Sequence, residues 1–292
     1  MAMKRLLRRG SAGEDVLLLK KRLFELCCYE PRITQITTSV FGKDTQSAVM
    51  AFQANNGLIV DGIVGNATYA ALFPEELESA QAPEGFPQQL NADAAANILE
   101  ALSNVNVTRQ AIVLDALQFA SDPGLPRDYP QSLYIRGGNL YNADLLPNVI
   151  TLARIRSGTE RQPEYYDGGR QQMMERAVAE NPSITGADCS GGVVGLLRHA
   201  GVVKPTFDLA ANGFAQQKGM QRVEQTQLLP ADLLHKSGHI GLYAGGGYAV
   251  EWMGGAYGCQ LTMLNDRRGW NYVKGKMDRF SAWTALLHTS WY

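Results

Sequence analysis

The stretch Thr185-Gly186-Ala187-Asp188-Cys189-Ser190-Gly191-Gly192 stands directly before an apolar run of helical spacing. That run consists of Val193, Val194, Leu196, Leu197 and Ala200, and it predicts a buried helix with Cys189 among its first residues. The free N–H groups and the positive dipole end of a helix stabilise a thiolate. Cys189 is therefore a candidate nucleophile, with a purely structural cysteine at a helix start as the alternative.

Four histidines could supply the base that such a nucleophile needs. His199 lies on the predicted helix itself, roughly 15 Å along its axis from Cys189. His288 lies near the C-terminus, and we expect both to be structural or surface residues. His239 begins the predicted strand 239–244 after the turn Lys236-Ser237-Gly238, and His235, just before that turn, is its main rival.

The following hairpin provides a partner for His239. A three-residue loop at 244–246 would pair Tyr243 with Gly247 and place His239 opposite Glu251 on the same face of the sheet. Glu251 would then accept the second imidazole N–H and fix the tautomer of the base. A loop of two or four residues would shift the pairing and could leave Glu251 as an exposed strand residue.

Three motifs in this region resemble the NlpC-type family of papain-like cell-wall cysteine peptidases. They are Asp188-Cys189-Ser190-Gly191, Pro230-Ala231-Asp232-Leu233 and Gly238-His239-Ile240-Gly241-Leu242-Tyr243. The resemblance implies catalysis by Cys189, His239 and Glu251, although many relatives have His, Asn or Gln where this chain has Glu251. Asp188 and Ser190 become candidate substrate contacts, with capping of the helix as an equally weighted alternative.

A further segment, Leu133-Tyr134-Ile135-Arg136-Gly137-Gly138, is similar to the Tyr-x-x-Gly-Gly segment of the same family. The resemblance implies that Tyr134 lines the substrate cleft. Tyr165-Tyr166-Asp167-Gly168-Gly169 has the same pattern and is the competing assignment. This second copy lies in residues 139–187, where relatives have a short loop, and its helical runs near 148–156 and 170–180 predict an inserted subdomain beside the cleft.

The N-terminal region has a different character. Apolar spacing predicts helices at 14–26, 44–55 and 67–73, and Val40-Phe41-Gly42-Lys43-Asp44-Thr45 is echoed by Ile63-Val64-Gly65-Asn66-Ala67-Thr68 before the second and third helices. The segments Gly10-Ser11, Gly13-Glu14-Asp15-Val16, Ala51-Phe52-Gln53, Asn56-Gly57-Leu58 and Val60-Asp61-Gly62 resemble the three-helix peptidoglycan-binding module of cell-wall hydrolases. A generic helical spacer is the alternative.

These patterns predict an α+β protein with two domains. We expect a peptidoglycan-binding domain at 1–73, a linker at 74–90 rich in Pro, Glu and Gln, and a papain-like, NlpC-type domain at 91–292 with an insert at about 139–187. Helices near 91–102 and 108–120, the latter behind a Thr108 cap, precede short strands at 231–235, 239–244, 248–252, 259–263 and 283–287. The expected sheet is therefore antiparallel.

Composition excludes several other classes of protein. A net charge of −1 over 292 residues gives no electrostatic drive toward nucleic acid, so no nucleic-acid partner is expected. The chain has no apolar run long enough for membrane insertion. The four cysteines, of which Cys27 and Cys28 are adjacent and expected to pack in a core, have neither disulfide-framework nor zinc-ligand spacing. No metal or cofactor is therefore expected.

The resemblance implies a hydrolase that cuts the D-isoglutamyl-diamino acid amide of the peptidoglycan stem peptide, with peptidoglycan as its partner. The alternatives are a CHAP-like N-acetylmuramoyl-L-alanine amidase, which also uses Cys, His and Glu, a non-catalytic wall adhesin and an intracellular acyltransferase. No apolar segment follows the basic N-terminal residues, so we expect synthesis in the cytoplasm without a signal peptide and action at the cell wall after release. This layout is similar to a phage endolysin, with a host autolysin as the alternative, and the sequence does not determine the oligomeric state.

Overall fold

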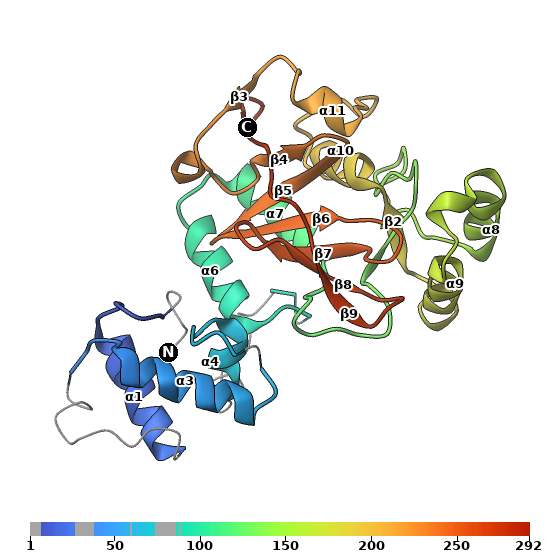
Figure 1. Ribbon diagram of the computed structural model, residues 1–292. Coiled ribbons are helices and arrows are strands. Elements are labelled where there is room, and N and C mark those ends of the chain that lie inside the picture. The colour runs from blue at the N-terminus through green and yellow to red at the C-terminus, as the bar shows by residue number, and fades with distance from the viewer. Residues whose placement is uncertain (1–6, 27–37, 59, 74–85, 88) are drawn as a thin grey trace. The chain divides into compact units, whose positions relative to one another are not determined.

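The computed structural model describes residues 7–26, 38–58, 60–73, 86, 87 and 89–292. The chain divides into two compact units, Met1–Gln81 and Ala82–Tyr292 (Figure 1). Cys27, Cys28 and most of the expected linker 74–90 lie outside the described residues. Phe86 and Leu90, from the end of that expected linker, are buried in the core of the second unit.

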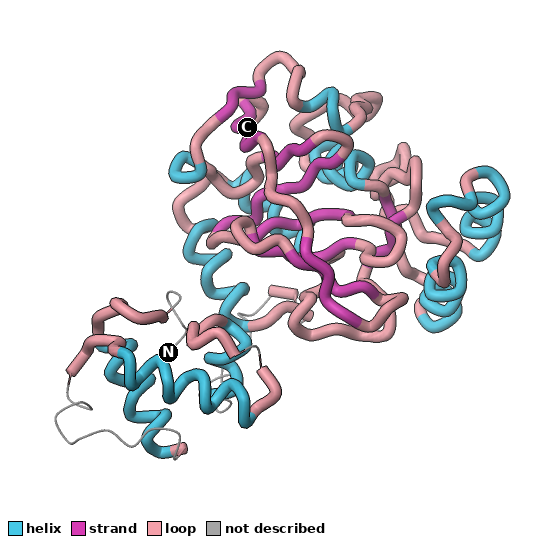
Figure 2. The backbone as a smooth tube through the Cα atoms, in the orientation of Figure 1, coloured by secondary structure: helices cyan, strands magenta, loops and turns pink. Residues whose placement is uncertain are grey.

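The described part of the first unit consists of helices and loops (Figure 2). Its helices are α1 (Glu14–Glu25), α3 (Lys43–Asn55) and α4 (Asn66–Leu72), each within one or two residues of the range predicted by apolar spacing. The two echoed segments lead into their helices in the same way, because an extended glycine directly precedes each helix, Gly42 before α3 and Gly65 before α4. Leu19, Leu23, Val49, Phe52, Val64 and Leu72 are among the side chains that form its core.

The second unit is built on a six-stranded antiparallel sheet, which confirms the expected α+β class. The strand order is β3-β10-β4-β5-β6-β7. The strands are β3 (Met220–Arg222), β4 (Leu233–Lys236), β5 (His239–Gly245), β6 (Tyr248–Trp252), β7 (Cys259–Met263) and β10 (Ala285–Thr289). The sheet carries a buried apolar cluster against which helices pack.

The helices of that cluster come from both halves of the unit. Helices α6 (Ala92–Leu102), α7 (Val107–Leu117) and α10 (Cys189–His199) pack against β5, and α10 also contacts β6. Short α11 (Ala211–Phe214) contacts β4 and β5, and the 3-10 turn η2 (Gln225–Gln227) precedes β4. Helix α10 thus packs as one layer on the central strands of the sheet. This packing fixes the residues at the start of α10 relative to β5.

A second, smaller apolar core lies beside the sheet and α10. Parallel strands β1 (Ser132–Tyr134) and β2 (Thr185–Ala187) lead to it, and α8 (Leu152–Arg161), η1 (Pro163–Tyr165) and α9 (Arg170–Glu180) lie together at one side of the sheet (Figure 1). The hairpin β8 (Arg268–Asn271) and β9 (Lys276–Arg279) completes the set. Tyr166, Met173 and Met174 are buried with Leu133 and Tyr272, so this segment shares an apolar core with β1 and the end of β8 that is separate from the core on the sheet.

Several expected boundaries were wrong for local reasons. The strand expected from residue 231 begins at Leu233, because Ala231 has a φ of 72° that no strand residue adopts. The helix expected at 148–156 begins only after Thr151, whose side chain accepts the Arg154 N–H. The cap of α7 is Asn106 rather than Thr108, since its side chain accepts the Arg109 N–H.

The predicted hairpin register was also wrong. Tyr243 pairs with Ala249 rather than Gly247, and the register shifts between Tyr243 and Gly245. The turn contains Gly246 and Gly247, both with positive φ, so the hairpin loop has two residues. Strand β5 contains a bulge between Tyr243 and Gly245. The displacement is two residues, and side chains alternate with period two, so the predicted face of every residue is retained.

Candidate active site

Cys189 is the first residue of α10 and directly follows β2. Its side chain is 5% exposed. Asp188 is the helix cap, since its Oδ1 accepts the Gly191 N–H at 2.8 Å and the Ser190 hydroxyl at 3.0 Å. Its Oδ2 accepts the Gly137 N–H at 3.0 Å, so both carboxylate oxygens are bonded within the fold. These bonds fix the backbone around Cys189, whose sulfur lies 4.0 Å from the Gly238 carbonyl oxygen.

The helix start is held against a neighbouring turn by close backbone packing. A Cβ added at Gly191 would lie 1.9 Å from the Gly138 carbonyl oxygen. In addition, the Asp188 N–H donates to that same oxygen at 3.0 Å. Only glycine allows this approach at position 191, which explains the glycine that ends the motif Asp188-Cys189-Ser190-Gly191.

His239 is the first residue of β5, and the carbonyl oxygen of the preceding Gly238 lies 4.0 Å from the Cys189 sulfur. His239 Nε2 hydrogen-bonds with Glu251 Oε2 at 2.7 Å, which leaves Nδ1 as the ring nitrogen available to Cys189. Burial lowers the pKa of His239, but hydrogen bonds with Cys189 and Glu251 and their charges outweigh it, so the pKa is raised above its usual range. The imidazole is therefore held as a proton acceptor between a thiol and a carboxylate.

Glu251 on β6 is completely buried. Its Oε1 accepts from the Thr262 hydroxyl at 2.6 Å and from Arg267 Nε at 2.8 Å, and Oε2 accepts from Arg267 Nη2 as well as from His239. Burial raises the pKa of the carboxyl, but these bonds from Arg267 and His239 bring it down to about 2. A buried carboxylate with this many donors is charged at neutral pH.

Arg267 and Trp283 are parts of the site that the sequence analysis missed. The Arg267 guanidinium is buried, lies 4.3 Å from the centre of the Trp283 ring and donates through Nη1 to the Ser281 carbonyl at 3.0 Å. The same indole ring stacks on His239, with centroids 5.5 Å apart and planes inclined by 11°. No local pattern marks these residues, because they reach the site from loops that follow β7 and β9.

Tyr134 lies at the end of β1, where it pairs with Ala187 of β2, two residues before Cys189. Burial raises its pKa, and the nearby Cys189 and Asp188 raise it further, so the phenol is neutral. Of the competing pair, Tyr166 is buried in the smaller core with Leu133 and Tyr272. Tyr165 instead faces the Arg136 guanidinium, 5.1 Å from its ring centre, so both Tyr-x-x-Gly-Gly segments contribute a residue near the start of α10.

The other histidines have partners of their own. His235 Nε2 bonds to Asn212 Oδ1 at 3.3 Å, and the same oxygen accepts the Gly238 N–H at 2.7 Å. Burial, Arg222 and His239 lower the pKa of His235. His199 bonds to Asp115 at 2.8 Å, and His288 lies 3.1 Å from Asp232. None of the three is bonded to Glu251.

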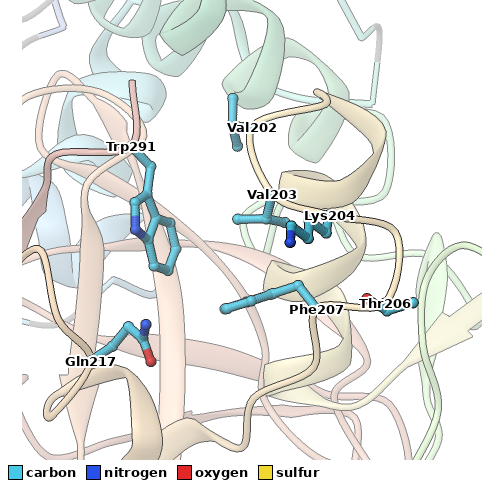
Figure 3. Close-up of a pocket in the computed structure, with 7 residues that line it drawn as sticks. All are labelled: Val202, Val203, Lys204, Thr206, Phe207, Gln217 and Trp291. Atoms are coloured by element: carbon cyan, nitrogen blue, oxygen red, sulfur yellow. The ribbon is translucent and has the colours of Figure 1, made fainter.

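A pocket of about 330 Å³ lies elsewhere in the second unit (Figure 3). Trp291 faces Phe207 across it, with ring centroids 5.4 Å apart, and Val202 and Val203 are also in its wall. None of the candidate site residues lines it. Among the described residues, no cluster of three or more His, Cys, Asp and Glu could hold a metal ion, and no helix is long and apolar enough to cross a membrane.

Comparison with known proteins gives a family for the first unit. Residues 12–72 match the family described as a putative peptidoglycan binding domain. This match supports peptidoglycan as a partner of the chain. The SleB N-terminal domain, a solved structure, aligns with 26% of this chain and 97% of its own at 33% identity and a TM-score of 0.23.

Two matches extend over more of the chain. The N-acetylmuramoyl-L-alanine amidase CwlM of Mycobacterium tuberculosis is 26% identical over 204 residues, which is 70% of this chain and 44% of CwlM. The chain thus spans less than half of that relative's length. The Burkholderia AP3 phage endolysin aligns with 61% of this chain and 63% of its own at 20% identity and a TM-score of 0.24, too low a score to relate the folds.

Proposed function

We propose that the protein is a peptidoglycan hydrolase that cleaves a stem-peptide amide by nucleophilic catalysis. The observation that carries the proposal is that the Cys189 sulfur at the helix start lies 4.0 Å from the carbonyl oxygen of Gly238, the residue before His239, and that the His239 imidazole is bonded at 2.7 Å to the buried Glu251 carboxylate. A nucleophile, a base and a group that orients the base are the parts that such catalysis needs.

The proposed reaction proceeds in two steps. His239 takes the thiol proton, and the Cys189 sulfur attacks the amide carbonyl carbon, while N–H groups at the start of α10 hold the developing oxyanion. The protonated His239 gives its proton to the departing amine, leaving a thioester on Cys189. Water then attacks the thioester, with His239 again taking a proton, and the carboxylate product leaves. Glu251 keeps the imidazole oriented and stabilises its charged form throughout.

The bond that we propose is the D-isoglutamyl-diamino acid amide. The support is the resemblance of the motifs around Cys189 and His239 to the NlpC-type papain-like peptidases, together with an α10 that packs on antiparallel β5 and β6. Residues 91–292 would then be the peptidase domain and 139–187 its insert. Tyr134 would line the cleft, and Ser190 would contact substrate. Asp188 has both carboxylate oxygens bonded to its own fold, so its proposed part is to position Ser190 and the Gly137 turn.

The first unit would bring this site to its substrate. A peptidoglycan-binding domain joined to a hydrolase raises the local concentration of stem peptides without adding contacts at the site. The proposed place of action is therefore the bacterial cell wall, as for an endolysin or autolysin.

A second candidate is cleavage between muramic acid and L-Ala, because the relative CwlM is named an N-acetylmuramoyl-L-alanine amidase. The chemistry of Cys189, His239 and Glu251 would be the same for that bond. The two candidates differ only in the ends that the reaction leaves.

Mass spectrometry of fragments released from diaminopimelate-type sacculi tests both candidates. New diaminopimelate α-amines with D-isoglutamate carboxyl ends are the expected products, and new L-Ala amines would move the proposal to the amidase. Cys189→Ala should release nothing while still sedimenting with sacculi. Lysis that persists in Cys189→Ala would refute the mechanism, and a wild-type protein that binds sacculi without cutting them would be an adhesin.

A further inference from the structure

The turn after β1 presents an unpaired cation beside the candidate nucleophile. Arg136 is exposed, and no acceptor among the described residues bonds to its guanidinium. The turn itself is tied to the residues before Cys189, since the Ile135 N–H donates to the Ala187 carbonyl at 3.0 Å and the Gly137 N–H to Asp188 Oδ2 at 3.0 Å. Arg136 is thus placed by the same backbone bonds that place the start of α10.

The inserted segment holds this cation from the other side. The Tyr165 ring at the end of η1 lies 5.1 Å from the guanidinium carbon of Arg136. From α8, Arg154 Nη2 donates to the Arg136 carbonyl oxygen at 2.9 Å, which brings a second guanidinium to the same turn. When a guanidinium lies over an aromatic ring, the N–H groups along its edge stay available to a ligand. The ring contact also limits the orientations that the arginine side chain adopts.

The charge of Arg136 is stabilised by groups around the start of α10. Burial lowers the pKa of its guanidinium, but Tyr165, Tyr134, Asp188 and Cys189 all favour the charged form, so the pKa is raised. Asp188 does not neutralise it by direct bonding, because its two oxygens accept from Gly191, Ser190 and Gly137. Among the described residues neither Arg136 nor Arg154 has a carboxylate partner, and both lie at the turn that is bonded to the residues before Cys189.

We propose that Arg136, supported by Tyr165 and Arg154, binds a free carboxylate of the stem peptide next to the scissile amide. The inference rests on the proposed function and deepens it, because it assigns the site a preference for stem peptides whose carboxylates are not amidated. A planar guanidinium matches a carboxylate with two parallel N–H···O bonds, and the neutral amide offers one acceptor and no charge. It also gives the insert a part in specificity, since Tyr165 and Arg154 both come from it.

Binding to the inactive Cys189→Ala protein tests the preference apart from catalysis. The probes are three muramyl tripeptides that differ only in amidation: free acid, D-isoglutamine, and diaminopimelate with its side-chain carboxyl amidated. Calorimetry should give a Kd at least about tenfold higher for one of the two amidated peptides than for the free acid. Adding Arg136→Gln should raise the Kd of the free acid to that of the amidated peptide, leaving a difference of less than about threefold.

Arg156→Gln is the matched control. Arg156 is on the same helix as Arg154, its side chain is 65% exposed, and it lies 3.6 Å from Glu175 instead of near the turn. The preference should be unchanged in this variant. Equal affinity of the Cys189→Ala protein for all three peptides, or an equal loss of affinity for all three on Arg136→Gln, would overturn the inference.

Cleavage of the same peptides by the wild-type protein separates the two proposals. Cleavage without any effect of amidation refutes the carboxylate site and leaves the hydrolase in place. Selective binding without cleavage of any peptide or of sacculi refutes the hydrolase and supports the carboxylate site as a recognition site.

Discussion

Replacing Arg267 by methionine removes the group that holds Glu251 charged inside the protein. The arginine is 4% exposed and the glutamate 0%, and two guanidinium N–H groups bond to the two carboxylate oxygens. Methionine fills similar space without a charge, so Glu251 is left with donors from Thr262 and His239 only. Removing one partner of a buried ion pair costs about 3–5 kcal/mol, so we expect Arg267→Met to lower the free energy of unfolding by that amount at pH 7.

The same change should alter how stability depends on pH. The pKa of Glu251 is about 2 in the folded protein against an ordinary 4.5, a difference that corresponds to roughly 3 kcal/mol. Because this folded pKa is depressed, the stabilisation is fully present above 4.5 and is lost as the pH falls from 4.5 through about 2. Without Arg267 the pKa of Glu251 rises, so Arg267→Met should show little or none of this loss between pH 4.5 and about 2.

His239 contributes with the opposite sign. Its folded pKa is raised from 6.5, so its stabilisation is complete below 6.5 and is lost as the pH rises through the folded value. If Glu251 is neutral in Arg267→Met, this raised pKa should fall as well. The acidic limb of the pH–rate profile reports the pKa of His239 as the base. We therefore expect this limb to move to lower pH and the maximal rate to drop.

Urea unfolding followed by tryptophan fluorescence measures these effects in the second unit alone, since all tryptophans of the chain, Trp252, Trp270, Trp283 and Trp291, lie there. Arg279→Met is the control, because Arg279 is 70% exposed and pairs with Asp266 at the surface. An exposed pair is worth about 0–1 kcal/mol. Equal losses in the two variants, or parallel pH profiles for Arg267→Met and wild type, would refute the reasoning.

Three further expectations follow from other contacts. In Gly192→Ala the new Cβ would lie 2.3 Å from the buried Trp252 ring. Overpacking of this kind costs about 1–3 kcal/mol, so the melting temperature should fall by several degrees although alanine has the better helix propensity. An unchanged melting temperature would contradict this packing. His235→Gln should keep sacculus hydrolysis within about threefold, whereas His239→Gln should lose at least about 100-fold, and the reverse order would exchange their roles. Gln53→Leu removes side-chain bonds at 2.9–3.1 Å to the loop before α4 and to Thr68 in its first turn. Binding to sacculi should therefore be lost with the tryptophan unfolding curve unchanged, and retained binding would show that these bonds are dispensable.

Local pattern predicted the helices of the first unit and several of the helices and strands of the second. The spacing of Leu19 and Leu23, or the glycine turns before α3 and α4, fixes helices through interactions between residues near in sequence. Alternation of side chains predicted β6 and β7 with their observed ends. The contact between His239 and Glu251 was predicted through a register that was wrong by two residues, and it was still made, because a shift of two residues keeps both side chains on one face.

The sequence by itself therefore determined that Cys189 begins a buried helix, that His239 and Glu251 face the same side of a hairpin, and that an α+β unit follows a small helical one. Only the tertiary structure decided which distant groups complete the site. Arg267, Trp283 and Arg136 reach it from separate loops, and their positions depend on how the sheet, the insert and α10 pack together. No local sequence pattern predicts such contacts, because packing and buried charge pairing act between residues that are far apart in the sequence.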